Sequence, residues 1–402
     1  MRHLAVVGGG FAGLWAALTA AREFSLAKEP CRIALVSRDE FLTVRPRLYE
    51  AFNPAMRVPL APILAAVDIE LLVGEVTAVE PDHRRLNVLT GDGVARGAHF
   101  DRLVLATGSR QRPLPVAGAE RYAFDIDTFS AAARLDQHLQ AQMKDGKTTA
   151  DTTFVIIGAG FTGIELATGM RTRLNAHADE AKARTVRVIL VERSGELGPD
   201  LGAAPRPHLL AALKASGVEL LLGRNVEAIT PNGVLLSDGE RLDAKTVVIA
   251  TGLEASPLGS ALGATGDSLG RLEVDENLRV PEYPTIFAAG DCAHAKVDET
   301  HWALMSCQHA IPMGKHAGHN AARDLLGLPL RAYRQPDYVT CLDLGDYGAL
   351  LTSGWNREPL QWGAEVKALK HTINTEWIYP PAPERGKIFA AADLDAPWPP
   401  PT

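Results

Sequence analysis

The sequence predicts an α/β protein in which parallel strands alternate with helices, and two features lead to this prediction. An apolar, strand-like segment runs directly into a glycine-rich turn and then into a helical segment, and this order occurs twice. Each copy also contains a later apolar strand that ends in Ala-Thr-Gly. The paired segments are residues 4–7 and 154–157, 8–13 and 158–163, 14–22 and 164–174, and 102–105 and 246–249. This pattern indicates an internal duplication of one strand–helix–strand unit.

The first glycine turn has the spacing Gly-x-Gly-x-x-Gly. Gly8 allows a tight turn, Gly10 lets the backbone approach a pyrophosphate, and Gly13 lets helix and strand pack closely. The unpaired N–H groups and the positive end of the following helix then face the phosphates. We therefore expect a Rossmann-like dinucleotide site, with Phe11 and Ala12 completing its loop.

The second turn repeats this spacing about 150 residues later. Gly158, Gly160 and Gly163 hold the three glycine positions, and Phe161 and Thr162 complete the loop. One such motif is a weak signal, but two in one chain predict two dinucleotides, or one flavin and one nicotinamide.

Size and composition indicate a globular protein of two or three domains. The chain has 402 residues, of which 46% are hydrophobic and 22% charged, and its net charge is −7. This acidic balance disfavours nucleic acid and anionic membranes as bulk electrostatic partners. The widely spaced cysteines form no disulfide or zinc-like cluster, and no apolar stretch of about 18 residues predicts a transmembrane helix. We expect a cytoplasmic protein without a metal site; the four cysteines are Cys31, Cys292, Cys307 and Cys341.

The residue after the second strand of each unit normally binds a ribose. In the second unit this residue is Glu192, which favours NADH because a carboxylate repels a 2′-phosphate. Arg193 beside it keeps NADPH open as the alternative. The first unit instead offers Ser37, followed by Arg38, so its ribose contact would be a hydroxyl hydrogen bond.

Small residues at the ends of three further strands complete the two predicted sites. A backbone can touch a bound nucleotide at such positions, and an aspartate at a strand end can bond sugar-like hydroxyls or cap a helix. These residues are Ala106, Thr107 and Gly108, then Thr251 and Gly252, and finally Gly290 and Asp291.

The remaining segments are assigned by pattern. Residues 41–49, aromatic and basic, either pass the flavin ring or form a surface loop with Arg45 and Arg47 solvated. Residues 339–351 alternate like strands, and residues 362–377 predict an amphipathic helix for core packing, subunit packing or peripheral membrane contact. The proline-rich tail from residue 397 is expected to be loose.

These motifs together resemble the pyridine nucleotide-disulfide oxidoreductase superfamily of two-dinucleotide flavoproteins. Within it the chain is most similar to type II NADH dehydrogenases, sulfide:quinone oxidoreductases and apoptosis-inducing-factor-like proteins, on the stretches 41–51 and 160–167. The motifs that carry the resemblance are VVGGGFAG (6–13), LVLATG (103–108), VIIGAGFTGIELA (155–167), VVIATG (247–252) and TIFAAGD (285–291).

The resemblance implies two Rossmann-like three-layer domains, the second inserted in the first, and a small α+β C-terminal domain. The expected FAD-binding domain comprises residues 1–115 and 275–328, the NAD(P)H-binding domain 116–274, and the C-terminal interface domain 329–402.

The resemblance also implies roles for single residues. The first glycine loop and Gly108 would hold FAD, Asp291 its ribityl chain, and Arg45 with Pro46 would lie near the isoalloxazine. The second glycine loop and Glu192 would bind NADH. Glu165 would steer the nicotinamide or handle a proton, although a carboxylate favoured by the helix N-terminus is the alternative. Gln308 would stabilise negative charge on the reduced ring.

Two departures from the family bear on the mechanism. No cysteine lies between Cys31 and Cys292, so the redox-active pair of the disulfide reductases is absent. The paired glutamines of the type II NADH dehydrogenases are reduced to Gln308, with Pro312 at the second position. Electrons would then pass directly from flavin to the acceptor.

Three functions follow as hypotheses. The first is an FAD-dependent NADH dehydrogenase that transfers a hydride to flavin N5 and reduces a quinone or another small acceptor. The second is a reductase of a ferredoxin or rubredoxin, which requires a basic docking patch. The third is a nicotinamide-sensing interaction protein with little turnover. For the NADH dehydrogenase hypothesis, we expect the protein to contact the inner face of the membrane peripherally or to form a homodimer.

Overall fold

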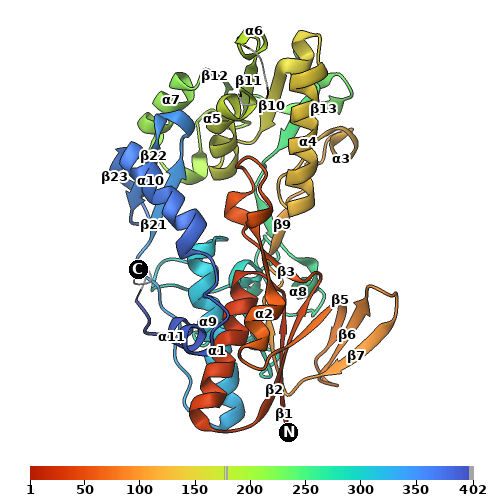
Figure 1. The fold of residues 1–402 in the computed structure, drawn as a ribbon, viewed down its shortest axis with the longest axis vertical. Coiled ribbons are helices and arrows are strands. Elements are labelled where there is room, and N and C mark those ends of the chain that lie inside the picture. The colour runs from red at the N-terminus through yellow and green to blue at the C-terminus, as the bar shows by residue number, and fades with distance from the viewer. Residues whose placement is uncertain (176, 178–179, 398–402) are drawn as a thin grey trace.

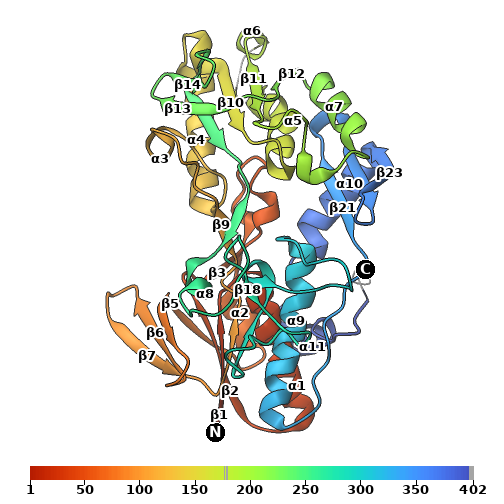
Figure 2. The ribbon, with the colours of Figure 1, turned by 180° about the vertical axis from the view of Figure 1, so that it is seen from behind.

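The computed structural model describes residues 1–175, 177 and 180–397, so the tail predicted to be loose lies largely outside the described residues. The chain forms an elongated molecule with the two glycine loops in different lobes (Figure 1). The view from behind shows the same two lobes joined by the ribbon that contains β9 (Figure 2).

The first lobe is organised around a seven-stranded sheet, and β1 is the middle one of its five parallel strands. The strands β19, β8, β1, β2 and β5 run parallel, and β5, β6 and β7 form an antiparallel meander. In sheet order they are β19 (Ile286–Ala288), β8 (Arg102–Leu105), β1 (Arg2–Val7), β2 (Cys31–Ser37), β5 (Glu70–Glu80), β6 (Arg85–Thr90) and β7 (Ala95–His99). The inner strands are apolar and buried, as expected for a parallel sheet.

Two long helices pack closely in this lobe, and glycine makes this possible. In α9 (Cys307–Leu326), a Cβ on Gly314 would lie 2.3 Å from the carbonyl oxygen of Ala12, and one on Gly318 would lie 2.0 Å from that of Ala16. Both alanines belong to α1 (Phe11–Ala27). The backbones of α1 and α9 are therefore in direct contact, which brings the first turn of α9 toward the first glycine loop.

The second lobe repeats the arrangement on a smaller scale. Its parallel sheet has the order β12 (Val218–Leu221), β11 (Arg187–Val191), β10 (Thr153–Ile157) and β16 (Thr246–Ile249). Its other elements are the sheet of β13 (Val226–Thr230), β14 (Gly233–Leu236) and β15 (Arg241–Asp243), and the helices α4 (Phe129–Asp145), α5 (Phe161–Asn175), α6 (Glu180–Ala183) and α7 (Arg206–Ala215). The predicted duplication is therefore confirmed in the fold.

Short elements complete and connect the lobes. The crossing between the lobes is made by the antiparallel pair β9 (Ser109–Gln111) and β17 (Leu253–Ala255). The others are β3 (Phe41–Thr43), β4 (Arg57–Pro59), β18 (Leu272–Glu273), β20 (Ala293–His294), α2 (Leu60–Ala65), α3 (Ala119–Tyr122) and α8 (Pro257–Ser260).

The C-terminal part forms an antiparallel sheet against α5 and α7 (Figure 1). It contains β21 (Val339–Asp343), β22 (Ala349–Ser353) and β23 (Glu358–Gly363), followed by α10 (Ala364–Thr372) and a π-helical segment, Ile373–Trp377. The predicted helix over 362–377 is wrong at its start. Trp362 pairs with Leu350 in the sheet, and Gly363, with φ +106°, ends that strand.

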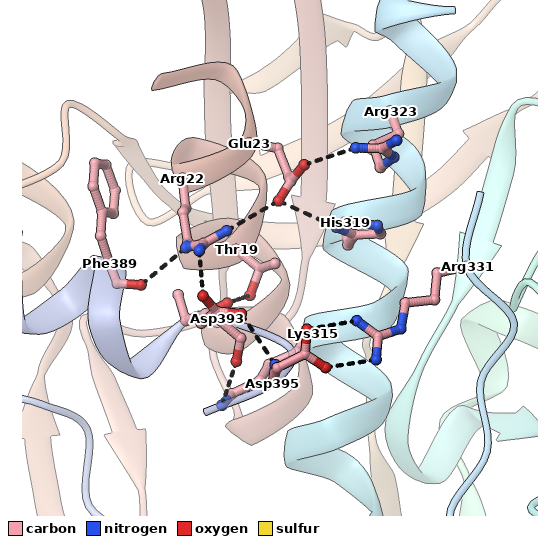
Figure 3. Close-up of polar contacts among 11 residues, drawn as sticks. Thr19, Arg22, Glu23, Lys315, His319, Arg323, Arg331, Phe389, Asp393 and Asp395 are labelled. Atoms are coloured by element: carbon pink, nitrogen blue, oxygen red, sulfur yellow. Dashed lines mark hydrogen bonds and ion pairs between the residues drawn. The ribbon is translucent and has the colours of Figure 1, made fainter. Parts of the chain in front are cut away.

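The chain then returns to the first lobe, where α11 (Arg385–Ala391) and the residues after it cross α1 and α9 (Figure 3). The Thr19 hydroxyl donates to the Ala392 carbonyl oxygen at 3.1 Å, and Arg22 Nε donates to the Phe389 carbonyl oxygen at 3.1 Å. Arg22 also forms an ion pair with Asp393. These contacts attach the C-terminal segment to the helix that follows the first glycine loop.

Candidate functional site

The two glycine loops have matching geometry. Gly8 has φ +119° and Gly158 has φ +104°, and a Cβ at these positions would lie 2.1 Å and 2.5 Å from the carbonyl oxygens of Ala106 and Ala250. A Cβ on Gly13 or Gly163 would lie 1.8 Å from the carbonyl oxygen of the loop's own first glycine.

Around the middle glycine of each loop, Gly10 and Gly160, there is open space: a Cβ there would meet nothing within 4 Å. The first and last glycines therefore close the turn, and the middle one leaves a cradle at the start of the helix. In α1 no side chain caps this start, so its N–H groups remain available for phosphate oxygens.

The side chains predicted to contact ribose lie at both loops. Ser37 is buried beside Gly9, whose Cβ would lie 2.3 Å from the Ser37 hydroxyl oxygen. Glu192 is buried as well, and its carboxylate accepts from the N–H groups of Ala159 and Ser194, both at 2.9 Å. Arg38 and Arg193, the neighbours of these residues, are exposed.

Asp291 lies next to the first glycine loop, because Gly290 contacts Ala12: a Cβ on Gly290 would lie 2.8 Å from the Ala12 Cβ. The Asp291 carboxylate accepts from the Ser109 hydroxyl at 2.5 Å and lies 3.6 Å from Arg45 Nη1. Burial raises the pKa of this carboxyl, and Arg45 partly offsets the rise.

The surface-loop alternative, with both arginines solvated, is wrong, because Arg47 is buried and Arg45, with a side chain that is 31% exposed, is held by two carboxylates. Arg45 forms an ion pair with Asp127 as well as lying near Asp291. Arg47 is buried and pairs with Glu50 at 2.9 Å. Pro46 is half-buried between them.

The strand ends that follow β8 and β16 lie beside the loops. Ala106 and Ala250 contact the first glycine of their respective loops, as described above, and Thr107 has a buried hydroxyl with no hydrogen-bond partner among the described residues. Such a group fits a polar ligand atom at the first cradle. Gly108 accepts from the Ser256 N–H at 3.0 Å, and the Thr251 hydroxyl and the Gly252 carbonyl bond the backbone of Arg112.

Glu165 forms a buried ion pair with Lys370 of α10, with Oε1 and Nζ separated by 3.0 Å. Glu165 also accepts from the Asp343 N–H at 3.1 Å, and Lys370 donates to the Cys341 carbonyl oxygen at 2.9 Å. Burial raises the pKa of the Glu165 carboxyl against the opposing effect of Lys370. Burial favours neutral Lys370, but the Glu165 carboxylate outweighs it and raises the Lys370 pKa, so the amine keeps its proton.

This ion pair extends into a polar network that reaches the surface. Asp343 pairs with Lys367, whose side chain is 41% exposed. The Tyr49 hydroxyl donates to Asp343 Oδ2 at 3.0 Å, and burial raises the Tyr49 pKa well above its usual value. Lys370, Tyr49 and Asp343 are site residues that no sequence motif predicts.

The first turn of α9 contains Cys307, Gln308 and the fully buried His309. The Gln308 side-chain amide, oriented to satisfy its neighbours, donates to the Val339 carbonyl oxygen at 2.6 Å and accepts from the Val339 N–H at 3.2 Å. Since Pro312 has no N–H, the Gln308 carbonyl oxygen lacks its helical partner and accepts from Gln335 Nε2 at 3.1 Å. Gln308 therefore joins α9 to the C-terminal sheet.

The comparisons with known proteins agree with this geometry. An NADH dehydrogenase-like protein of Mycobacterium tuberculosis is 44% identical over 98% of both chains. Demethylphylloquinone reductase NdbB of Synechocystis is 30% identical, covering 87% of this chain and 86% of the relative. The solved NDH2 of Plasmodium falciparum in complex with NADH has the same fold, with a TM-score of 0.78, 12% identity, and coverage of 100% of this chain and 99% of that one.

Residues 2–314 match the pyridine nucleotide-disulphide oxidoreductase family. The two open cradles, the buried Ser37 and Glu192 side chains beside them and the orphaned Thr107 hydroxyl fit the two cofactors of such proteins. This chain therefore belongs to the pyridine nucleotide-disulphide oxidoreductase family, with FAD and a nicotinamide nucleotide as its cofactors.

Proposed function

We propose that this protein oxidises NADH through FAD and passes the electrons directly to a quinone or another small acceptor. Its family makes it a flavin-dependent NAD(P)H oxidoreductase. The observation that carries the finer proposal is the pairing of two equivalent glycine cradles with the lack of any cysteine between Cys31 and Cys292. The cysteine pair of the disulfide reductases is therefore missing, and all four cysteines are free thiols, which supports transfer without a disulfide relay.

The proposed FAD site belongs to the first lobe, with domain boundaries at residues 1–115 and 275–328. Its residues would be Gly8, Gly10, Phe11, Ala12, Gly13, Ser37, Arg38, Arg45, Pro46, Ala106, Thr107, Gly108, Gly290, Asp291 and Gln308. The helix N-terminus would bind the pyrophosphate.

The proposed nicotinamide site belongs to residues 116–274, and residues 329–402 form the proposed interface domain. The site residues would be Gly158, Gly160, Phe161, Thr162, Gly163, Glu165, Glu192, Arg193, Thr251 and Gly252. Buried Glu192, which already accepts two backbone N–H groups, supports NADH over NADPH because a 2′-phosphate would meet its charge.

When bound, FAD supplies the redox chemistry, since it accepts a hydride from NADH at N5 and passes electrons on. The protein's own contribution is orientation and proton control. We assign Lys370 Nζ to hold a proton beside Glu165 Oε1, at the junction of α5, α10 and the first turn of α9. The Asp343 backbone N–H, which donates to Glu165, would hold the Glu165 carboxylate in place beside Lys370, and the Asp343 carboxylate pairs with Lys367. Gln308, joined to β21, would orient the first turn of α9.

The surface of the C-terminal sheet and a named relative bear on the location of the protein and on its acceptor. Within the described residues, no helix is long and apolar enough to cross a membrane. Exposed apolar side chains on the C-terminal sheet, Val339, Leu360 and Trp362, support a peripheral contact with the inner face of the membrane or with a second copy of the chain. The relative named demethylphylloquinone reductase supports a quinone as acceptor.

A steady-state acceptor panel tests this proposal. The purified flavoprotein is assayed with NADH and with NADPH against a soluble quinone, oxygen and a ferredoxin. The proposal predicts that NADH with the quinone gives the highest kcat/KM. Faster turnover with the ferredoxin would contradict it, and so would an NADH-dependent shift on gel filtration with negligible turnover by every acceptor.

A further inference from the structure

The C-terminal end of α11 is bound by side chains of α1 (Figure 3). The Thr19 hydroxyl donates to the Ala392 carbonyl oxygen and Arg22 Nε donates to that of Phe389, both at 3.1 Å. The last carbonyl groups of a helix have no intrahelical partner and carry negative potential. A hydroxyl and a guanidinium are therefore the donors that this helix end needs, and α1 supplies both.

The residues after α11 cross from α1 to α9. The Asp393 carboxylate pairs with Arg22 of α1, and the Asp393 carbonyl oxygen accepts from Lys315 Nζ of α9 at 3.4 Å. Lys315 Nζ also lies 4.8 Å from the centre of the Trp15 ring, which belongs to α1. One residue of the C-terminal segment thus joins the two helices.

A second carboxylate extends this crossing. Asp395 pairs with Arg331 at 2.6 Å. The Arg331 N–H donates at 2.9 Å to the side-chain oxygen of Asn320, a fully buried residue of α9. We call residues 385–396 the C-terminal strap, because they run from α1 to a segment that Asn320 anchors on α9.

The strap is part of the core of the first lobe. Ile388 and Ala392 are fully buried and belong to the same apolar cluster as Ala16 of α1 and Ala317 of α9. Thr19 is fully buried as well, and its hydroxyl has its partner in the strap. A buried hydroxyl is unfavourable without a partner, so this part of α1 is suited to being covered by the strap.

The strap contacts lie within one turn of a point where α1 and α9 touch. Gly318 meets the carbonyl oxygen of Ala16, one turn before Thr19 in α1. Gly314 meets that of Ala12, which belongs to the first glycine loop. Contacts between such small residues weaken steeply when two helices move apart. The spacing of α1 and α9 therefore affects both the strap contacts and the position of the first cradle.

We infer that strap docking and FAD binding are coupled: the strap closes on α1 and α9 when FAD orders the first cradle, and the docked strap keeps FAD bound. Both events favour the same spacing of the two helices, and such coupling is reciprocal. The strap then acts for the FAD-binding lobe, although the chain reaches it only after the C-terminal sheet. The inference rests on the proposed function only in taking the first cradle as the FAD site.

Hydrogen exchange of the unmodified protein tests the coupling without a substitution. Exchange is compared between the holoprotein and the FAD-free apoprotein, in peptides covering the strap and in peptides covering β10 of the second lobe. The inference predicts that the strap exchanges at least about 10-fold faster in the apoprotein, while β10 exchanges at the same rate in both forms. Equal strap exchange in the two forms would overturn the inference, and so would equal acceleration of the strap and β10, which indicates loss of the whole fold.

Variants test the reverse direction of the coupling. Thr19→Val removes the buried donor with little change of shape, and Asp393→Ala removes the carboxylate that pairs with Arg22. Thr172→Val is the matched control, since the Thr172 hydroxyl of α5 donates to Asp346 Oδ2 at 2.6 Å, in a contact that involves neither α1 nor α9. The dissociation constant of FAD is measured by titrating the apoprotein and following flavin fluorescence.

The inference predicts that both strap variants raise this dissociation constant, Thr19→Val by roughly 5-fold to 50-fold, and that Thr172→Val leaves it unchanged. An FAD affinity equal to that of the wild type in both strap variants would overturn the inference. Neither measurement needs turnover, so a protein that shows the coupling but does not oxidise NADH refutes the proposed function alone.

Discussion

Removing the ammonium of the Glu165–Lys370 pair is the sharpest perturbation of the site. Lys370→Met keeps a side chain of similar length but leaves the Glu165 carboxylate, 9% exposed, without its partner at 3.0 Å. Breaking a buried pair in this way costs about 3–5 kcal/mol, because one desolvated charge remains. Glu165→Gln should be costly as well, since it leaves the ammonium buried.

The double variant Lys370→Met/Glu165→Gln removes both charges and should be more stable than the sum of the single losses by about 2 kcal/mol or more. The free energy of unfolding is measured by urea titration of the holoprotein at a fixed excess of FAD. The matched control is the surface pair Arg187–Glu219, with side chains 43% and 44% exposed, where removal of one partner should cost less than about 1 kcal/mol.

The same variants connect stability to turnover. With the proton no longer held at Lys370 Nζ, kcat should fall about 10-fold or more, and the pH profile of kcat should change shape. The buried charged pair would be refuted if each single variant lost less than about 1 kcal/mol of unfolding free energy and the two losses added in the double variant. An unchanged kcat and pH profile in Lys370→Met would refute its role in proton control.

Three further predictions concern other parts of the molecule. Gly318→Val should abolish FAD retention, because a Cβ at this position would lie 2.0 Å from the Ala16 carbonyl oxygen. Gly169→Ala is the control and should retain the flavin, because a Cβ there meets nothing within 4 Å. The flavin-to-protein absorbance ratio measures FAD retention in both variants. Burial lowers the His309 pKa from 6.5 to about 4. As the pH falls, the unfolded chain therefore takes up a proton before the folded protein does. The free energy of unfolding should decrease by up to about 3 kcal/mol between pH 6.5 and pH 4. His309→Gln should flatten that part of the curve of unfolding free energy against pH, and an unchanged slope would contradict the burial of a neutral imidazole. Glu192→Ser should narrow the preference for NADH over NADPH in kcat/KM at least about 10-fold, and an unaltered ratio would remove Glu192 from ribose recognition.

The parts of the fold set by local pattern were predictable from the sequence. Each glycine loop joins a buried apolar strand to a helix within a few residues, and the structure forms both as expected. The start of α10 was predicted wrongly because Trp362 has helical spacing with Val366, whereas its pairing with Leu350 depends on the neighbouring strand.

The site was only partly predictable, because its polar contacts join distant segments. The second motif predicts Glu165, but its partner Lys370 lies about 200 residues further along the chain in α10, and no motif there marks it as a site residue. Nothing local marks Tyr49 or Asp343, which meet only when the C-terminal sheet packs on α5. A charged residue at helical spacing on an otherwise apolar face, as Lys370 is, was the one available signal.

The central claim is that two coenzymes lie in the two cradles so that electrons pass from one to the other without a thiol relay. Anaerobic mixing of the purified protein with one equivalent of NADH tests it most directly. The account predicts a flavin spectrum that bleaches on mixing and returns when a soluble quinone is added. A protein that yields no FAD on denaturation, or a flavin that stays oxidised in the presence of NADH, would contradict the account.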